Sequence, residues 1–281
     1  MIRQEEREIH IMKNIDSVQN PRVKQWKKLQ TKKERDKKGL FFVEGFHLVE
    51  EALKAGVVTE LIVSDQTDLP KDWTVNDVEM YIVPEAIVKV LRETETTQGV
   101  FAVCEKHESE VALTDGKFLL LDGLQDPGNL GTIIRTADAA GIHAVVLGEG
   151  CVDAYNSKVL RSTQGSIFHL PIVKGNLKEW VDKLKENNVP VYGTALENGV
   201  PYGEVTPAGS FALIVGNEGN GVRQEILAKT DQNLYIPIYG GAESLNVAVA
   251  AGILTYYLQS PVANKKKTSY NKLKYIILKV K

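Results

Sequence analysis

Three short segments of this sequence are rich in both glycine and asparagine. They read DPGNLG at residues 126–131, GNEGNG at 216–221 and YGGAESLN at 239–246. Glycine lets the backbone approach a ligand closely or adopt positive φ, and asparagine tolerates the same geometry while donating and accepting hydrogen bonds. The segments therefore predict a small polar ligand that is held largely by backbone groups. The polar side chains in or beside them are Asn129, Arg135, Glu218, Ser244 and Asn246.

Several familiar kinds of ligand site do not fit these segments. None has the G-x-G-x-x-G spacing of a dinucleotide site, and none is followed by the G-K-[ST] of a nucleotide phosphate loop. The sequence also has no G-x-S-x-G nucleophile motif. It contains only two cysteines and five scattered histidines, so no metal site is expected.

Residues 117–260 are predicted to form one α/β domain that positions the three segments. Short apolar runs alternate there with helical stretches, which predicts a parallel sheet covered on both faces. The expected strands are 118–121, 144–147, 189–192, 211–215 and 234–238, and the expected helices are roughly 130–140, 156–163, 176–187, 221–228 and 244–259. Ligands in such sheets bind beyond the carboxyl ends of the strands. Arg135 falls in the first turns of its helix, where the helix dipole disfavours positive charge.

A second, smaller α/β domain is expected at residues 14–105, joined through a polar linker at 106–116. Its strands are expected near 41–43, 61–63, 80–83 and 100–103, and its helices at 20–38, 45–55 and 84–91. In the helix at 20–38, Asn20 is a candidate cap, Pro21 suits the first helical position, and apolar residues recur at three-residue spacing. Residues 261–281 form a basic tail to which no function is assigned.

The net charge of −2 conceals a strong asymmetry. Residues 22–38 hold nine basic and two acidic residues, whereas residues 39–264 hold 15 basic and 30 acidic ones. A basic arm on an acidic body is a candidate polyanion-binding element, although a solvated helix face remains the alternative. The composition, with 43% hydrophobic and 25% charged residues, is ordinary for a soluble protein. With no signal-peptide core and no apolar run long enough to span a bilayer, we expect a cytoplasmic protein.

The three segments resemble, in their order and spacing, the motifs of the SPOUT-class (SpoU/TrmH-type) RNA ribose 2′-O-methyltransferases. The stretches that carry the resemblance are LDGLQDPGNLGTIIRTADAAG, FALIVGNEGNGV and IPIYGGAESLNVAVAAGI. NSKVLRSTQGSIFHLPI is also similar to that family, and NPRVKQWKKLQTKKERDKKGLFFVEGFHLVEEAL is similar to the substrate-binding domain of many members. The resemblance covers about residues 14–260.

The resemblance implies a catalytic domain whose sheet is threaded through a deep trefoil knot, with S-adenosylmethionine bound in the knotted loops. Carried over residue by residue, it implies cofactor contacts at Thr194, Gly216, Ile236 and Leu245. It also implies a homodimer to which the helix at 244–259 contributes. The small residues of that helix permit close packing, either with a second subunit or within the chain.

The resemblance further assigns catalytic roles. Arg135 is expected beside the ribose 2′-hydroxyl, either as the base or, more economically for a guanidinium that holds its proton tightly, as a stabiliser of the developing oxyanion. Asn129 would fix Arg135 and the target phosphate or ribose, and Glu218, Ser244 and Asn246 would shape the site. The residues expected to bind RNA are Arg22, Lys24, Lys27, Lys28 and Arg161.

Each side chain also has a purely structural alternative. Arg135 could pair with Asp138 on its own helix, Asn129 or Ser244 could cap a helix, and Glu218 could be an acid placed favourably before the helix at 221. The function that all three motifs favour is methylation of a ribose 2′-hydroxyl in structured RNA, with ribosomal RNA preferred to transfer RNA as the substrate. Its alternatives are a non-catalytic RNA-binding or ribosome-assembly factor on the same fold, and a base methyltransferase.

Overall fold

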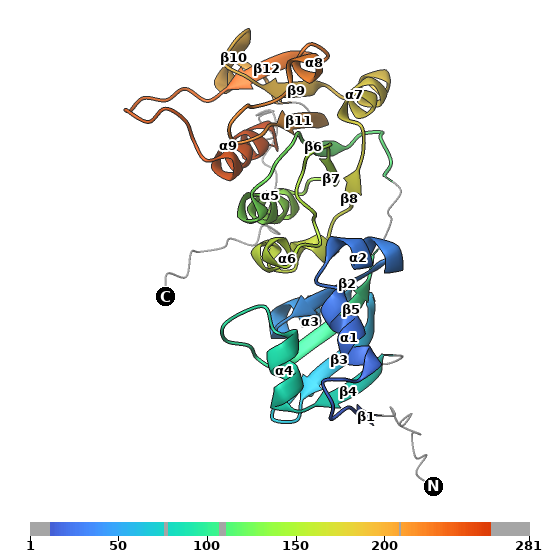
Figure 1. The fold of residues 1–281 in the computed structure, drawn as a ribbon. Helices are drawn as coiled ribbons and strands as arrows, with labels where there is room; N and C mark the ends of the chain where they lie inside the picture. The colour runs from blue at the N-terminus through green and yellow to red at the C-terminus, as the bar shows by residue number, and fades with distance from the viewer. Residues whose placement is uncertain (1–11, 76–77, 107–110, 208, 260–281) are drawn as a thin grey trace.

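The computed structural model describes residues 12–75, 78–106, 111–207 and 209–259, which form two α/β domains stacked end to end (Figure 1). The basic tail at 261–281 lies outside the described residues. No helix in the described part of the chain is long and apolar enough to cross a membrane.

The amino-terminal domain is built on a five-stranded sheet with the order β1-β4-β3-β5-β2. Strand β5 runs antiparallel to β2 and β3, and the remaining pairs are parallel. The strands are β1 (Lys13–Asn14), β2 (Leu40–Glu44), β3 (Val58–Ser64), β4 (Glu79–Val83) and β5 (Val100–Glu105). The helices are α1 (Pro21–Lys28), α2 (Lys32–Lys38), α3 (Phe46–Lys54) and α4 (Glu85–Leu91).

The single helix expected at 20–38 is wrong, because the chain breaks between α1 and α2 (Figure 1). Leu29 is fully buried, and Thr31 adopts an extended conformation before α2 begins. The carbonyl groups of Leu29 and Gln30 instead accept hydrogen bonds from the Arg35 guanidinium at 3.0 and 2.8 Å. A side chain from the second helix thus satisfies backbone groups at the break.

The carboxyl-terminal domain contains the expected parallel sheet. Its seven strands follow the order β10-β12-β9-β11-β6-β7-β8, and every neighbouring pair is parallel. The strands are β6 (Lys117–Leu121), β7 (Ala144–Leu147), β8 (Ile172–Lys174), β9 (Val191–Thr194), β10 (Gly199–Pro201), β11 (Phe211–Val215) and β12 (Gln232–Tyr235). The edge strands β8 and β10 are three residues long and were not expected from the sequence.

Helices cover both faces of this sheet, because successive residues of each strand point to opposite sides. Leu119 and Leu121 pack on the face that carries α5 and α9, whereas Phe118 and Leu120 pack on the face that carries α7 and α8. The helices are α5 (Pro127–Ala139), α6 (Ser157–Thr163), α7 (Leu177–Glu186), α8 (Gln224–Leu227) and α9 (Val247–Gln259). Short 3₁₀ turns occupy Ser166–Phe168 and Tyr202–Glu204.

The helix after β6 starts earlier than the sequence suggested. Asp126 caps α5 by accepting a hydrogen bond from the Asn129 backbone N–H at 2.8 Å, and Pro127 is the first helical residue. DPGNLG is therefore the cap and first turn of the helix rather than a loop before it. Arg135 consequently lies in the third turn, where the field of the helix terminus has faded, so its expected placement in the first turns is wrong.

A buried ion pair joins the two domains. Arg35 of α2 and Asp153, which precedes α6, are 4% and 8% exposed, and the Arg35 Nη2 atom lies 2.7 Å from Asp153 Oδ2. Beside it, the Phe41 ring of β2 packs against Tyr155 and Phe168 of the carboxyl-terminal domain, with ring centroids 4.6 and 6.2 Å apart. The domains are thus held by matched charge and by a shared apolar core.

Arg35→Ala should lower the free energy of unfolding by about 3–5 kcal/mol, because it leaves the Asp153 carboxylate buried without a partner. Urea denaturation monitored by circular dichroism measures this change. The control is Lys54→Ala, which removes an exposed cation paired with Glu50 and Glu51 and should leave stability close to that of the wild type. Equal stability of the two variants would contradict the prediction.

Candidate active site

A cavity of about 520 Å³ lies at the carboxyl ends of β9, β11 and β12 and is bordered by α9. Its floor is apolar, with Leu234, Val247 and Leu254 among the lining residues. Seven residues predicted for the site line it: Thr194, Gly216, Glu218, Ile236, Ser244, Leu245 and Asn246. The second and third glycine-rich segments therefore meet at the edge of the sheet where ligands of such folds bind.

The first segment joins them through the side chain of Asn129. Its amide nitrogen donates to Glu218 Oε1 at 3.1 Å, and its amide oxygen accepts from the Asn246 side chain at 3.0 Å. Asn246 in turn accepts hydrogen bonds from the backbone N–H groups of Ala248 and Val249 at the start of α9. One amide thus connects α5, the loop after β11 and the beginning of α9.

This geometry decides several of the structural alternatives. Asp126, not Asn129, caps α5, and Asn246, not Ser244, occupies the capping position of α9. Helix α9 therefore begins at Val247 rather than at 244. Glu218 accepts hydrogen bonds at the start of α5 rather than of α8, which begins only at Gln224.

Glu218 is held as a carboxylate. Partial burial alone would raise the pKa of this group, but the Asn129 side chain and the backbone N–H groups of Asp126 and Gln125 donate hydrogen bonds to it. The hydrogen bonds prevail, and the pKa of Glu218 lies below its ordinary value. An ionised Glu218 can accept hydrogen bonds and orient Asn129 throughout the neutral pH range.

The glycine at 216 is required by close backbone packing. A Cβ atom there would lie 2.1 Å from the Gly221 carbonyl carbon and 2.2 Å from the Val222 nitrogen. Asn217 and Gly221 also exchange two backbone hydrogen bonds of 3.0 Å. The loop after β11 therefore closes on itself directly behind the cavity, and only glycine fits at its first position.

The structure adds one pair that the sequence analysis missed. Asp122, directly after β6, is 2% exposed and accepts hydrogen bonds from the Arg223 backbone N–H at 2.8 Å and from Arg223 Nε at 2.9 Å. Asn217 further ties the same loop to the Gly123 carbonyl at 2.9 Å. The pair anchors the loop that carries Glu218. An acid directly after a buried strand was the available signal, but its partner lies about a hundred residues away.

Arg135 stands apart from this network. It is exposed, it does not line the cavity, and the structure shows no ion pair between it and any described residue. Asp138, the alternative partner, instead contacts His169 Nδ1 at 2.8 Å. Because successive residues turn by about 100° around a helix, Arg135 also points to a different side of α5 than Asn129 does.

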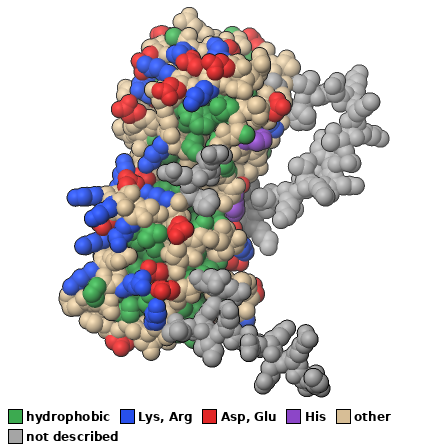
Figure 2. Space-filling view, turned by 90° about the vertical axis from the view of Figure 1, so that its right-hand side faces the viewer, with side chains coloured by type: hydrophobic (Ala, Val, Ile, Leu, Met, Phe, Trp, Pro, Cys, Tyr) green, Lys and Arg blue, Asp and Glu red, His purple; other side chains and the backbone are tan. Residues whose placement is uncertain are grey.

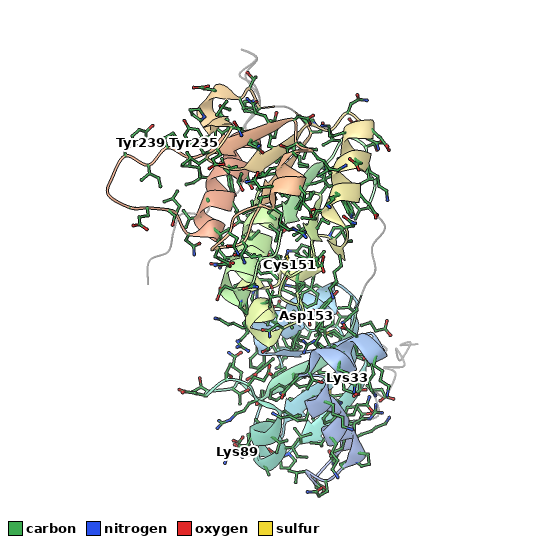
Figure 3. All side chains as sticks on the ribbon, turned by 45° about the horizontal axis from the view of Figure 1, so that its top comes forward. Lys33, Lys89, Cys151, Asp153, Tyr235 and Tyr239 are labelled. Atoms are coloured by element: carbon green, nitrogen blue, oxygen red, sulfur yellow. The ribbon has the colours of Figure 1, made fainter. Side chains whose placement is uncertain are left out.

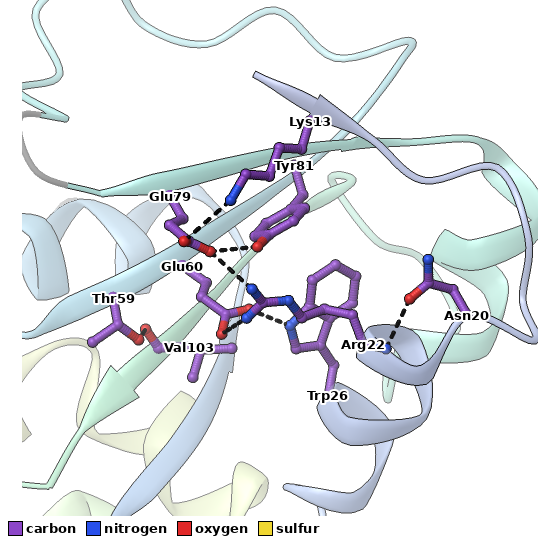
Figure 4. Close-up of polar contacts among 9 residues, drawn as sticks. All are labelled: Lys13, Asn20, Arg22, Trp26, Thr59, Glu60, Glu79, Tyr81 and Val103. Atoms are coloured by element: carbon purple, nitrogen blue, oxygen red, sulfur yellow. Dashed lines mark hydrogen bonds and ion pairs between the residues drawn. The ribbon is translucent and has the colours of Figure 1, made fainter. Parts of the chain in front are cut away.

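The residues predicted to bind RNA differ in their surroundings. Arg22 makes ion pairs with Glu60 at 2.8 Å and Glu79 at 3.0 Å, as Figure 4 shows. Glu60 also accepts a hydrogen bond from the buried Trp26 indole at 2.6 Å, so the pair belongs to the fold of the domain (Figure 4). Lys24, Lys27 and Lys28 are exposed, and Arg161 is half-buried near the domain junction.

Among the described residues, one group could gather metal-ligand atoms, namely His47, Glu50 and Glu51. It lies on α3, in the other domain from the cavity. Glu51 there contacts Lys54 and His169, and His47 contacts the Gln164 carbonyl. These side chains serve helix and domain packing.

Comparison with known proteins gives this architecture a class. Residues 116–256 match the model of the SpoU rRNA Methylase family, and residues 20–102 match that of the MRM3-like substrate binding domain. The matches place the chain among two-domain α/β RNA methyltransferases. A curated relative, the 23S rRNA (guanosine(2553)-2′-O)-methyltransferase RlmP of Bacillus subtilis, is 57% identical over 249 residues, which cover 88% of this chain and 100% of that protein. The chain belongs to the SpoU rRNA methylase family.

Solved structures agree. An AdoMet-bound rRNA methyltransferase from Sinorhizobium meliloti superposes with a TM-score of 0.80 at 31% identity, covering 88% of this chain and 97% of that one. The SpoU methyltransferase AviRb from Streptomyces viridochromogenes, in complex with AdoMet, gives a TM-score of 0.75 at 28% identity, with coverages of 85% and 97%. The predicted family and α/β fold class are thereby confirmed.

Asn129→Ala should raise the pKa of Glu218, because the burial of the carboxyl remains while its side-chain hydrogen-bond donor is lost. A pH titration of the Glu218 carboxyl carbon by NMR measures the shift. Asn220→Ala, in the same loop, removes a side chain for which the structure shows no hydrogen bond to a described residue, and it should leave the pKa unchanged. If both variants titrate like the wild type, the network does not control Glu218.

Proposed function

We propose that this chain transfers a methyl group from S-adenosylmethionine to the ribose 2′-hydroxyl of a guanosine in 23S ribosomal RNA. The observation that carries the proposal is the 57% identity to RlmP along that protein's whole length. The family to which the chain belongs supports the reaction class. The cytoplasm, where ribosomal RNA is found in a bacterium, is the proposed location.

The cavity suits the cofactor. Its volume of about 520 Å³ lies in the range of small-molecule sites, and apolar residues flank backbone groups of the third segment. The backbone of residues 238–245 makes no hydrogen bond with any described residue, so its N–H and C=O groups are available to a polar ligand. Thr194, Gly216, Ile236 and Leu245 are proposed to hold S-adenosylmethionine, which supplies an electrophilic methyl group when bound.

Arg135 is proposed to act on the ribose. The 2′-hydroxyl must lose its proton as the methyl group is transferred, and a guanidinium stabilises the oxyanion that develops. An exposed arginine that has no ion pair with a described residue keeps its charge available for a substrate, whether it acts as base or as stabiliser. Asn129, Glu218 and Asn246 complete the proposed site by fixing the loops around it, and Ser244 lines the cavity beside them.

A homodimer is part of the proposal. Val249, Ile253 and Tyr256 follow one another at helical spacing on α9 and are 52%, 36% and 50% exposed, which makes an apolar stripe beside the cavity. By contrast, Ala248 and Ala251 are buried, and Gly252 faces Thr136 of α5. The small residues of α9 thus serve packing within the chain, and the larger apolar side chains are the proposed contact with a second subunit.

The knotted path implied by the resemblance belongs to the proposal as well. After β12, the chain returns past the cavity to α9, which packs against α5 and β11 in the middle of the domain. A knot in this stretch would hold the third segment over the second through the path of the chain alone.

The activity is tested by mapping ribose methylation in 23S ribosomal RNA from cells with and without the gene. Loss of one 2′-O-methylguanosine, restored by the wild-type gene, is the expected result. A 23S RNA whose methylation is unchanged would contradict the proposal, and loss of a mark in transfer RNA instead would reassign the substrate.

Arg135→Ala should reduce methyl transfer to 23S RNA by at least about 100-fold while S-adenosylmethionine binding stays within about twofold, since oxyanion stabilisers contribute at this scale. Single-turnover transfer of a radiolabelled methyl group and calorimetry measure the two quantities. Arg92→Ala is the control, because Arg92 is a half-buried arginine of the other domain for which the described residues show one guanidinium hydrogen bond, to the nearby Glu95 carbonyl. Wild-type turnover by Arg135→Ala would remove this residue from the mechanism.

Gly216→Ala should weaken S-adenosylmethionine binding by about tenfold or more, because the added methyl group collides with the backbone at 221–222 and displaces the cavity wall. Gly219→Ala is the control, since its nearest neighbour would be the Asn217 side-chain oxygen at 3.5 Å. Calorimetric titration compares the variants. Equal affinities would show that the tight closure of the loop does not shape the cofactor site.

A further inference from the structure

The lysines of α1 and α2 form an exposed basic surface whose charge is not neutralised within the described chain. The surface comprises Lys24, Lys27, Lys28, Lys32, Lys33, Lys37 and Lys38, all of them exposed. None makes an ion pair with a described residue, whereas Arg22 and Arg35 in the same helices are paired with acids. Figure 2 shows Lys and Arg side chains gathered along one edge of the molecule at mid-height. This lysine surface therefore presents its charge to a partner.

A cleft of about 490 Å³ continues from this surface across the domain junction. Lys32 of α2 contributes from the amino-terminal domain. The catalytic domain contributes Lys174 at the end of β8, the first residues of α7 and the loop after β7. These segments lie at the carboxyl ends of β7 and β8, the same edge of the sheet as the active-site cavity.

The charges in the cleft favour an anion. Four basic residues line it, Lys32, Lys174, Lys178 and Arg223, against the acids Glu149 and Glu225. Lys178 is paired with Glu225 at 2.7 Å, and Arg223 is paired with the buried Asp122.

Two of the four basic residues in the cleft have no carboxylate partner among the described residues. Lys32 and Lys174 make no ion pair with any described residue. Asp36, which lies near both, is bonded to Lys106 at 2.6 Å. The amino-terminal end of α7, which is ten residues long, adds its partial positive charge.

We propose that the Lys32–Lys174 cleft binds a backbone phosphate of the substrate RNA and connects the lysine surface to the active site. This proposal rests on the proposed function. The loop of residues 216–223 supports the connection, because Glu218 faces the cavity at one end of it and Arg223 faces the cleft at the other. A strand whose phosphates follow the lysines into the cleft brings its next riboses to that loop.

The test measures equilibrium binding of unmodified 23S ribosomal RNA, isolated from cells lacking the gene, over a series of KCl concentrations. The full-length Lys32→Ala, Lys174→Ala double variant should bind roughly 10- to 30-fold more weakly at 0.1 M KCl. Its slope of log affinity against log salt should be smaller by about 1, because the contact with one backbone phosphate is lost. S-adenosylmethionine affinity should not change.

The matched control is the Lys71→Ala, Lys89→Ala double variant, which removes two exposed lysines outside the surface. Figure 3 shows Lys89 on α4, well away from Lys33 on α2. The control should keep the wild-type slope, and the Lys32→Arg, Lys174→Arg variant should restore it. A Lys32→Ala, Lys174→Ala protein with wild-type affinity and slope would overturn the proposal. Inorganic phosphate that binds in the cleft without displacing the RNA would also overturn it in favour of a free-anion site.

The two proposals fail separately in this design. If the double variant shows the smaller salt slope but the wild type forms no 2′-O-methyl group, the proposed function is wrong and the cleft remains an RNA contact. If the wild type methylates its RNA but the double variant binds RNA as the wild type does, only the cleft proposal is wrong.

Discussion

The amide of Asn129 is the interaction on which the active-site end of this protein depends. Its nitrogen and oxygen are both used, one on Glu218 and one on Asn246, so each terminus of the side chain holds a different segment. A hydrogen bond to a charged group contributes about 1.5–3 kcal/mol, and an unpaired polar group in the same place costs a similar amount. Three segments that are distant in the chain are therefore ordered by one side chain. The Asp122–Arg223 pair then keeps the Glu218 loop within its reach.

The sequence was informative wherever a local pattern had only one structural solution. Runs of consecutive apolar residues such as 118–121 are buried on both faces, and this demand is met by a parallel sheet with helices on either side. Glycine-rich segments after such strands could be assigned to the carboxyl edge on the same grounds. The residues expected around the cofactor line one cavity because they lie in these segments.

What the sequence could not supply were interactions between distant residues. The break after α1 depends on Arg35 reaching back to two carbonyl groups while it also pairs with Asp153, and no local pattern shows this. The edge strands β8 and β10 are short and half-buried, so they lack the apolar signature of central strands. Asp122 looked like part of a motif, but its function depends on Arg223. The helix after β6 was placed too late because its cap was read as part of a loop.

The junction between the domains has a consequence for how substrates are chosen. Arg35 and Asp153 are buried together, and the aromatic contacts of Phe41 surround them, so the amino-terminal helices keep a set position relative to the catalytic sheet. The distance between the lysine surface of these helices and the active-site cavity is therefore fixed. Under the proposed function, we expect an RNA to be accepted when its fold presents a ribose at the separation from its anchoring phosphates that this spacing sets. Recognition of that kind measures shape, and it can single out one nucleotide in a long RNA without reading the bases around it.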